Sequence, residues 1–118
     1  MIETWEDDNR KLHPDPWVPS GSPLVLGIAG KLCEEATEAA KVCSRIIIQG
    51  LAGIDPSTGL TNREELQKEI ADLEHMIEFA KREFFLDEDK IAIRRSSKTA
   101  FHLPWIQFLK NLAIRGSK

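Results

Sequence analysis

Residues 31–38 read Lys-Leu-Cys-Glu-Glu-Ala-Thr-Glu, and residues 69–72 read Glu-Ile-Ala-Asp. Each stretch lies in a longer segment where apolar residues recur three or four positions apart, which is typical of an amphipathic helix. These segments predict two long helices, over residues 23–49 and 62–85. No segment alternates with the period of two that a strand requires. The sequence therefore predicts an all-α fold.

Local signals mark the ends of both predicted helices. Ser22 is a good N-cap, and Pro23 suits the first helical position. Gly50 is expected to end the first helix. Thr61 and Glu64 have the spacing of a capping box, which predicts the start of the second helix.

The remaining chain predicts shorter elements around these helices. Residues 1–21 are expected to form an irregular arm. Asp87 is expected to cap a third helix over residues 88–97, and Pro104 to open a short fourth one within a helical tail over residues 100–118. We expect the helices to pack antiparallel as a bundle in one domain, residues 1–118. The predicted core stripes are Leu24, Ile28, Leu32, Ala36, Ala39, Cys43 and Ile46 on the first helix and Leu66, Ile70, Leu73, Ile77, Ala80 and Phe84 on the second.

Composition limits the classes of protein to consider. The 118 residues are 42% hydrophobic and 30% charged, as in soluble globular proteins. The net charge of −3 does not favour nucleic-acid binding. Cys33 and Cys43 would lie about 15 Å apart along one helix, too far for a disulfide, so we expect reduced core thiols and a cytoplasmic protein. No membrane association is expected, because the apolar run at residues 46–48 is far too short to span a bilayer.

Two acidic pairs are the most informative feature. Glu35 and Glu38 are three residues apart, as are Glu69 and Asp72, so each pair shares a helix face beside an apolar stripe. If the two helices pack antiparallel, the four carboxylates converge. At about 4 Å and an effective dielectric near 20, each like-charged pair would cost about 4 kcal/mol, so the cluster must bind protons or cations. Oxygen ligands favour Mg²⁺, with Mn²⁺ as a substitute.

The alternative is a solvated acidic helix face, which a single Glu-x-x-Glu motif often marks. Two such pairs on consecutive long helices favour the metal site. Zinc is not expected, since the sequence has no Cys-x-x-Cys pair. A phosphate-binding loop ending in Gly-Lys-Ser/Thr is also lacking.

The motifs at residues 31–38 and 69–72 resemble those of the MazG-like all-α nucleoside triphosphate pyrophosphohydrolases. The resemblance covers residues 24–99 and includes the basic stretch that contains Arg95 and Lys98. It implies Mg²⁺-dependent cleavage of a nucleoside triphosphate to a monophosphate and pyrophosphate. It also implies a homodimer or homotetramer in which helices of two subunits line the nucleotide pocket.

Motif positions carry the family's functional residues to this chain. Glu35, Glu38, Glu69 and Asp72 would be metal ligands. Glu34 would be a further ligand or the base for the attacking water, a role in which Glu38 is the other candidate. Thr99 stands where many members have asparagine, which puts that contact in doubt. The single-domain form resembles phage-encoded members, which would place the protein in the host cytoplasm and favours a deoxypurine substrate such as dGTP or dATP.

The triphosphate also needs basic partners and a base pocket. Lys31, Arg95 and Lys98 are the candidates for phosphate, with ordinary surface charge as the alternative for each. Trp17 and Ile28 are candidates for the base pocket, although the sequence favours an ordinary partly buried aromatic residue for Trp17. His75 follows Asp72 by three positions and suits either the edge of the metal site or a plain helix edge. A non-catalytic helical binding or regulatory module, or a nucleotide sensor, is the competing function.

Overall fold

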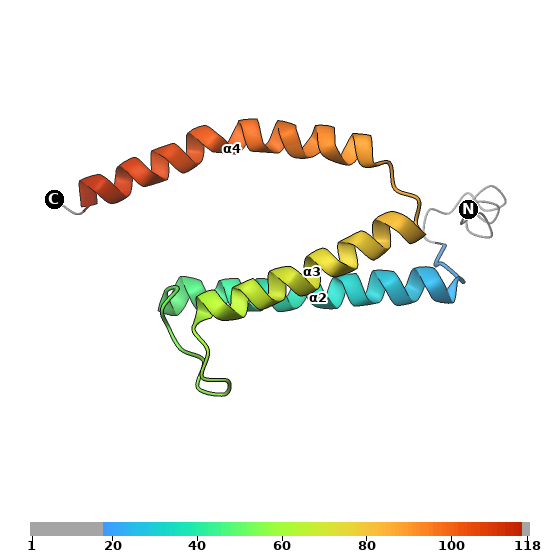
Figure 1. Cartoon of the computed structure of the whole chain (residues 1–118), viewed down its shortest axis with the longest axis horizontal. Helices are drawn as coiled ribbons and strands as arrows, with labels where there is room; N and C mark the ends of the chain where they lie inside the picture. The colour runs from blue at the N-terminus through green and yellow to red at the C-terminus, as the bar shows by residue number, and fades with distance from the viewer. Residues whose placement is uncertain (1–17, 117–118) are drawn as a thin grey trace. The chain divides into compact units, whose positions relative to one another are not determined.

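The computed structural model describes residues 18–116 as three long α-helices (Figure 1). They are α2 (Pro23–Gln49), α3 (Asn62–Glu83) and α4 (Glu88–Gly116). Within the described residues the only β-type pairing is an isolated antiparallel bridge between Ile54 and Thr61. The all-α prediction is confirmed. Most of the predicted amino-terminal arm, including Trp17, lies outside the described residues.

The helix ends follow the capping signals in the sequence. The Ser22 hydroxyl accepts a 3.2 Å hydrogen bond from the backbone N–H of Val25. Gly50 ends α2 with a φ of 78°, a conformation that glycine adopts without steric cost. Thr61 and Glu64 form the complete capping box at the start of α3. These predictions are confirmed, because each depends only on residues a few positions apart.

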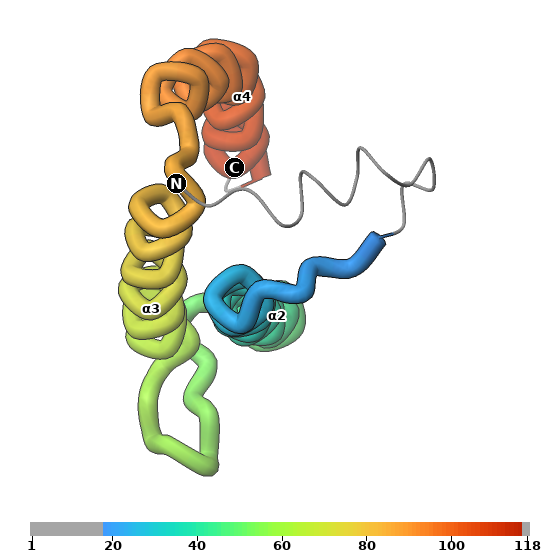
Figure 2. The backbone as a smooth tube through the Cα atoms, turned by 90° about the vertical axis from the view of Figure 1, so that its right-hand side faces the viewer, coloured from blue at the N-terminus to red at the C-terminus, as the bar shows by residue number. Residues whose placement is uncertain are grey.

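Helices α2 and α3 form an antiparallel hairpin, in which α3 returns alongside α2 after the loop (Figure 1). In Figure 2, α2 is seen nearly end-on with α3 beside it. Among the described apolar residues, only Val42 and Ala80 are fully buried. Around them lie half-buried side chains of both helices, namely Val25, Ile28, Leu32, Ala39 and Ile46 on α2 and Leu66, Leu73, Met76 and Phe79 on α3.

The predicted core stripe of α2 was too wide. Leu24, Ala36 and Cys43 are exposed, and Val42 is the buried residue instead. Successive helical residues differ by about 100°, so Cys43 points well away from Val42. Cys33 is exposed as well, so the expected core thiols are both on the surface. On α3, Ile70 and Ile77 are likewise partly exposed, since a single neighbouring helix covers only one face.

Polar contacts tie the loop between α2 and α3 to the two helices. Arg45 of α2 forms an ion pair with Asp55 of the loop. The Thr58 hydroxyl donates a 2.5 Å hydrogen bond to the carboxylate of Glu65, which is only 5% exposed. Asn62 is completely buried and donates from its side-chain amide to the backbone carbonyl oxygen of Gly50, over 2.9 Å. The loop is therefore a packed connection between the helices.

Helix α4 departs from the sequence prediction. Asp87 does cap it, because a carboxylate oxygen accepts from the backbone N–H groups of Asp89 and Lys90 at 3.0 and 3.1 Å. The predicted break before Pro104 is wrong, since one helix runs through that proline. Proline lacks the N–H that would reach the carbonyl oxygen of Ala100, but its fixed φ is helical, so the helix loses one hydrogen bond without ending.

The chain divides into two compact units, Met1–Leu86 and Asp87–Lys118. The first contains the α2–α3 hairpin and the second contains α4. No residue of α4 is buried. Among the described residues, no helix is both long and apolar enough to cross a membrane.

Candidate metal centre

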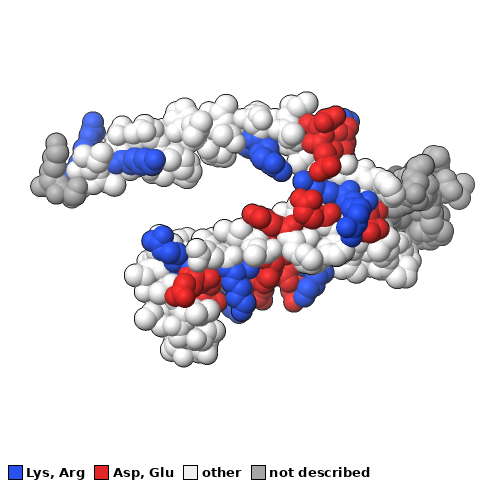
Figure 3. Space-filling model, viewed as in Figure 1, with Lys and Arg blue, Asp and Glu red and all other residues white. Residues whose placement is uncertain are grey.

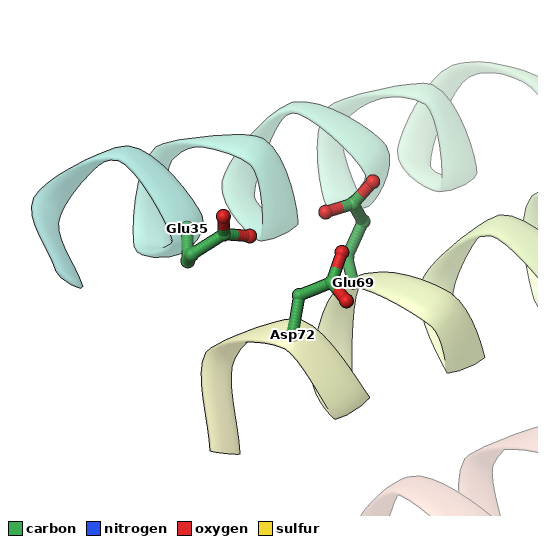
Figure 4. Close-up of side chains that lie close together, drawn as sticks. All are labelled: Glu35, Glu69 and Asp72. Carbon is green, nitrogen blue, oxygen red and sulfur yellow. The ribbon is translucent and has the colours of Figure 1, made fainter. Parts of the chain in front are cut away.

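Three of the four predicted ligands lie together between α2 and α3. Glu35, Glu69 and Asp72 each offer a carboxylate oxygen, and these three oxygens lie within 4.8 Å of one another. Figure 4 shows Glu35 on α2 and the other two side chains on α3, with their carboxylates directed into the space between the helices. The antiparallel hairpin places the acidic motifs side by side although they are far apart in sequence.

The two adjacent glutamates on α2 have different surroundings. The side chain of Glu35 is 12% exposed and that of Glu34 is 59% exposed, so only Glu35 points into the hairpin. Lys31 lies one turn earlier, and its ammonium is 3.3 Å from the Glu34 carboxylate and 3.4 Å from that of Glu35. Hydrogen bonds, to Glu34 first and then to Glu35, raise the pKa of Lys31. Lys31 therefore balances part of the negative charge at the edge of the cluster.

The surroundings of Glu69 disfavour the charged form of its carboxyl group. Burial raises the pKa of its carboxyl above the usual value, and the negative charges of Asp72, Glu38 and Glu35 raise it further. Lys68 opposes this shift only weakly. Figure 3 shows acidic side chains gathered midway along the hairpin with basic ones beside them. A cation placed among these carboxylates would remove the repulsion that Glu69 experiences.

Glu38 is half-buried, and its charge acts on Glu69, but it lies outside the group of three closely spaced carboxylates. It follows Glu35 by three residues, so it projects from nearly the same face of α2 one turn later. From this position Glu38 could reach the other three carboxylates by changing its side-chain rotamer and serve as a further ligand. Alternatively, it could act next to a bound metal without binding it. Glu34 is held on the outside by Lys31.

The other predicted site residues are not part of this cluster. Ile28 is half-buried in the α2 stripe, one turn before the acidic motif. His75 is exposed and packs edge-on against Phe79, with ring centroids 4.8 Å apart. Arg95 and Lys98 are exposed on α4, in the second unit of the chain. Their assignment to phosphate binding, like that of Trp17 to the base pocket, stays a prediction.

The carboxylate geometry fits a small divalent cation. In an octahedral magnesium site with bonds of about 2.1 Å, ligand oxygens are about 3 to 4 Å apart. The three oxygens lie within 4.8 Å, so small rotations of flexible side chains would complete three ligand positions. The donors are all carboxylate oxygens, which suit magnesium or manganese better than zinc. Water or phosphate oxygens would supply the remaining positions.

The sequence did not reveal the contacts that set the hairpin geometry. It identified every acidic residue of the cluster, but it treated Lys31 as a phosphate ligand and overlooked its pairing with Glu35. The four-residue spacing of these two side chains is the signal for that pair. No such signal exists for Asn62 or Glu65, because their contacts depend on the path of the loop.

Comparisons with protein-family models, curated proteins and solved structures find no match for this chain.

Proposed function

We propose that this chain is a magnesium-dependent nucleoside triphosphate pyrophosphohydrolase. The observation that carries the proposal is the convergence of Glu35, Glu69 and Asp72 from two helices. The order of their motifs resembles that of MazG-like enzymes. This resemblance is the reason to propose pyrophosphohydrolysis as the reaction at the metal site. The products would be a nucleoside monophosphate and pyrophosphate, with a deoxypurine triphosphate as the preferred substrate.

The residues present can serve this reaction in distinct roles. Phosphoryl transfer depends mainly on positioning and on neutralising negative charge, for which no covalent nucleophile is needed. Magnesium, when bound, neutralises phosphate charge and lowers the pKa of a coordinated water. Glu35, Glu69 and Asp72 would hold it on the hairpin. Glu38, which is half-buried on the same helix as Glu35, would accept a proton from the attacking water.

We also propose that the protein is a homo-oligomer, either a dimer or a tetramer. A single chain buries few apolar side chains, namely Val42 and Ala80 among the described residues. Large apolar side chains of α4 remain open to solvent, including Phe101 at 74% and Phe108 at 57% exposure. Association with further copies would cover such surface.

Pyrophosphate release from a panel of ribo- and deoxyribonucleoside triphosphates, with and without Mg²⁺, tests the activity. We expect release from at least one nucleotide, only with the metal. Glu69→Gln and Glu38→Gln should reduce release to background while helical content is retained. Glu74→Gln, at an exposed position of the same helix, is the matched control and should retain activity.

A non-catalytic binding or regulatory module is the second candidate. The exposed apolar side chains of α4, such as Trp105 and Leu112, favour it, because such a helix suits docking against another protein. This function predicts no pyrophosphate from any nucleotide on the panel. It also predicts that Glu38→Gln leaves partner binding unchanged.

A further inference from the structure

Acidic and basic residues are segregated along the chain. All 19 Asp and Glu residues lie within residues 1–89, whereas residues 90–118 contain seven Lys and Arg and no acidic residue. The net charge of −3 for the whole chain therefore conceals a strongly basic segment, and most of this segment belongs to α4. A segment whose charged side chains are all positive attracts polyanions.

Four basic side chains near the start of α4 have no acidic partner among the described residues. They are Lys90, Arg94, Arg95 and Lys98, and all four are exposed. None of the ion pairs that the described residues form includes any of them. They extend over about 12 Å of helix. A row of cations of this length suits several successive phosphates of a strand better than a single anion.

Aromatic residues follow these cations on the same face of α4. Lys90, Arg94, Lys98, Phe101 and Trp105 are separated by four, four, three and four residues, so their side chains lie along one line of the helix. We call these five residues the basic–aromatic stripe. Its first half is cationic and its second half aromatic, which is the combination that binds phosphates and bases in single-stranded nucleic acids.

The aromatic half of the stripe forms an open pocket on the surface of α4. Phe101, His102, Pro104 and Trp105 line it. The ring centroid of His102 lies 5.3 Å from that of Phe101 and 5.8 Å from that of Trp105. Phe101 is 74% exposed and Trp105 is 53% exposed, so both rings are open to a ligand from solvent. Exposed rings of this kind can stack against a flat, unpaired base.

We propose that the basic–aromatic stripe of α4 binds single-stranded nucleic acid, with its cations on the phosphates and its rings stacked on the bases. A duplex suits the stripe less well, because its bases are already stacked on one another. An anionic membrane also suits it less well, because a helix that lies on a bilayer keeps its cations opposite its apolar side chains. The proposal uses no residue of the acidic cluster and holds whether or not the chain is catalytic.

Fluorescence anisotropy of a labelled oligothymidylate of about 16 nucleotides, mixed with the full chain, tests the binding. EDTA is present, so no metal can bridge the strand to the acidic cluster. We expect saturable binding, and the logarithm of the association constant should fall against the logarithm of salt concentration with a slope of about −3, because four cations contribute about 0.7 each on a single strand. No binding, or tighter binding to the matching duplex or to phosphatidylserine vesicles, would overturn the proposal.

Trp105→Ala tests the stacking and should weaken binding by about tenfold or more. Leu103→Ala is the matched control, since Leu103 is 60% exposed and projects from the opposite side of the same helix. An abasic strand of the same length keeps the phosphates but has no bases, so Trp105→Ala should not weaken its binding. Equal losses for the two variants, or an equal loss on the abasic strand, would contradict the stacking. Circular dichroism checks that both variants stay helical.

Lys98→Gln tests the phosphate contacts and should reduce the magnitude of the salt slope by about 0.7. Lys110→Gln is the control, because Lys110 is exposed on α4 but lies off the stripe, and it should leave the slope unchanged. Light scattering identifies the competing occupant. If Trp105→Ala lowers the mass of the assembly and leaves the affinity for the strand unchanged, a second copy covers the rings and the proposal is wrong. Pyrophosphate release, measured separately, tests the catalytic proposal.

Discussion

The side-chain amide of Asn62, in the first turn of α3, donates a 2.9 Å hydrogen bond to the backbone carbonyl oxygen of Gly50, the residue that ends α2. This contact joins the two helices that hold the acidic cluster. Asn62 is fully buried, and a Cβ atom at Gly53 would lie only 3.0 Å from its amide nitrogen. The loop therefore closes tightly around this side chain and fixes where α3 begins.

We expect Asn62→Ala to lower the free energy of unfolding by about 1 to 3 kcal/mol, because it leaves the Gly50 carbonyl oxygen without its buried donor. Urea denaturation followed by circular dichroism measures the change. Asn111→Ala is the control, since Asn111 is exposed on α4 and its side-chain oxygen accepts a hydrogen bond from Gln107 on the same helix. If both variants lose the same stability, the amide contact does not hold the hairpin.

We expect Glu69→Gln to weaken metal binding without destabilising the metal-free fold. Burial and its acidic neighbours raise the pKa of Glu69, so the metal-free fold gains stability as pH falls through that pKa and loses it as pH rises. The amide removes this charge, and metal-free Glu69→Gln should melt no lower than the wild type at pH 7.

Magnesium should then act differently on the two proteins. At a hundred times its dissociation constant, a ligand adds about 2.7 kcal/mol to the stability of the folded state. We expect a magnesium-induced rise in melting temperature for the wild type and little for Glu69→Gln, measured by differential scanning calorimetry. Glu74→Gln should respond as the wild type does. Equal rises in all three proteins would place the bound metal elsewhere.

We expect Asp55, in the loop between α2 and α3, to stabilise the fold in a way that is lost at acid pH. Hydrogen bonds from the Ser57 hydroxyl and backbone N–H, followed by one from Arg45, lower the pKa of Asp55 from 3.8 to about 2. A carboxyl with a depressed folded pKa stabilises the fold above its unfolded pKa, and this contribution is lost as pH falls through the folded pKa. Asp55→Asn should therefore melt below the wild type at pH 7, and the gap should close between about pH 4 and about pH 2. A gap that stays constant over this range would rule out the titration of Asp55 as its cause.

We expect replacement of Pro104 to increase the stability of α4. Pro104→Ala restores a backbone N–H that can reach the Ala100 carbonyl oxygen, and removing an interior proline favours a helix by up to about 3 kcal/mol. Thermal melts at 222 nm should show a higher midpoint or a larger helical signal. Gln107→Ala, at an exposed position on the same helix, serves as the comparison. A lower midpoint for Pro104→Ala would mean that the proline ring contacts a partner surface.

The fold class, several helix ends and the residues of the acidic cluster could be predicted from the sequence alone. The all-α class, the ends of α2 and the capping box of α3 depend on contacts between residues a few positions apart, so local patterns predict them. The acidic cluster was predictable because Glu69 and Asp72 share one helix face by spacing, as Glu35 and Glu38 do. The continuity of α4 was not predicted, because a proline weakens a helix without always ending it.

Only the tertiary structure decided which face of α2 is covered. The spacing of apolar residues placed Cys43 in the core, whereas packing against α3 buries Val42 and leaves Cys43 exposed. The structure also decided that Glu35, with Glu69 and Asp72, belongs to the close group while Glu38 lies outside it. A periodic pattern fixes which residues share a face, but the rotation of one helix against another depends on contacts between distant residues. Those contacts, made here through the loop and the hairpin, are not encoded in any short stretch of the chain.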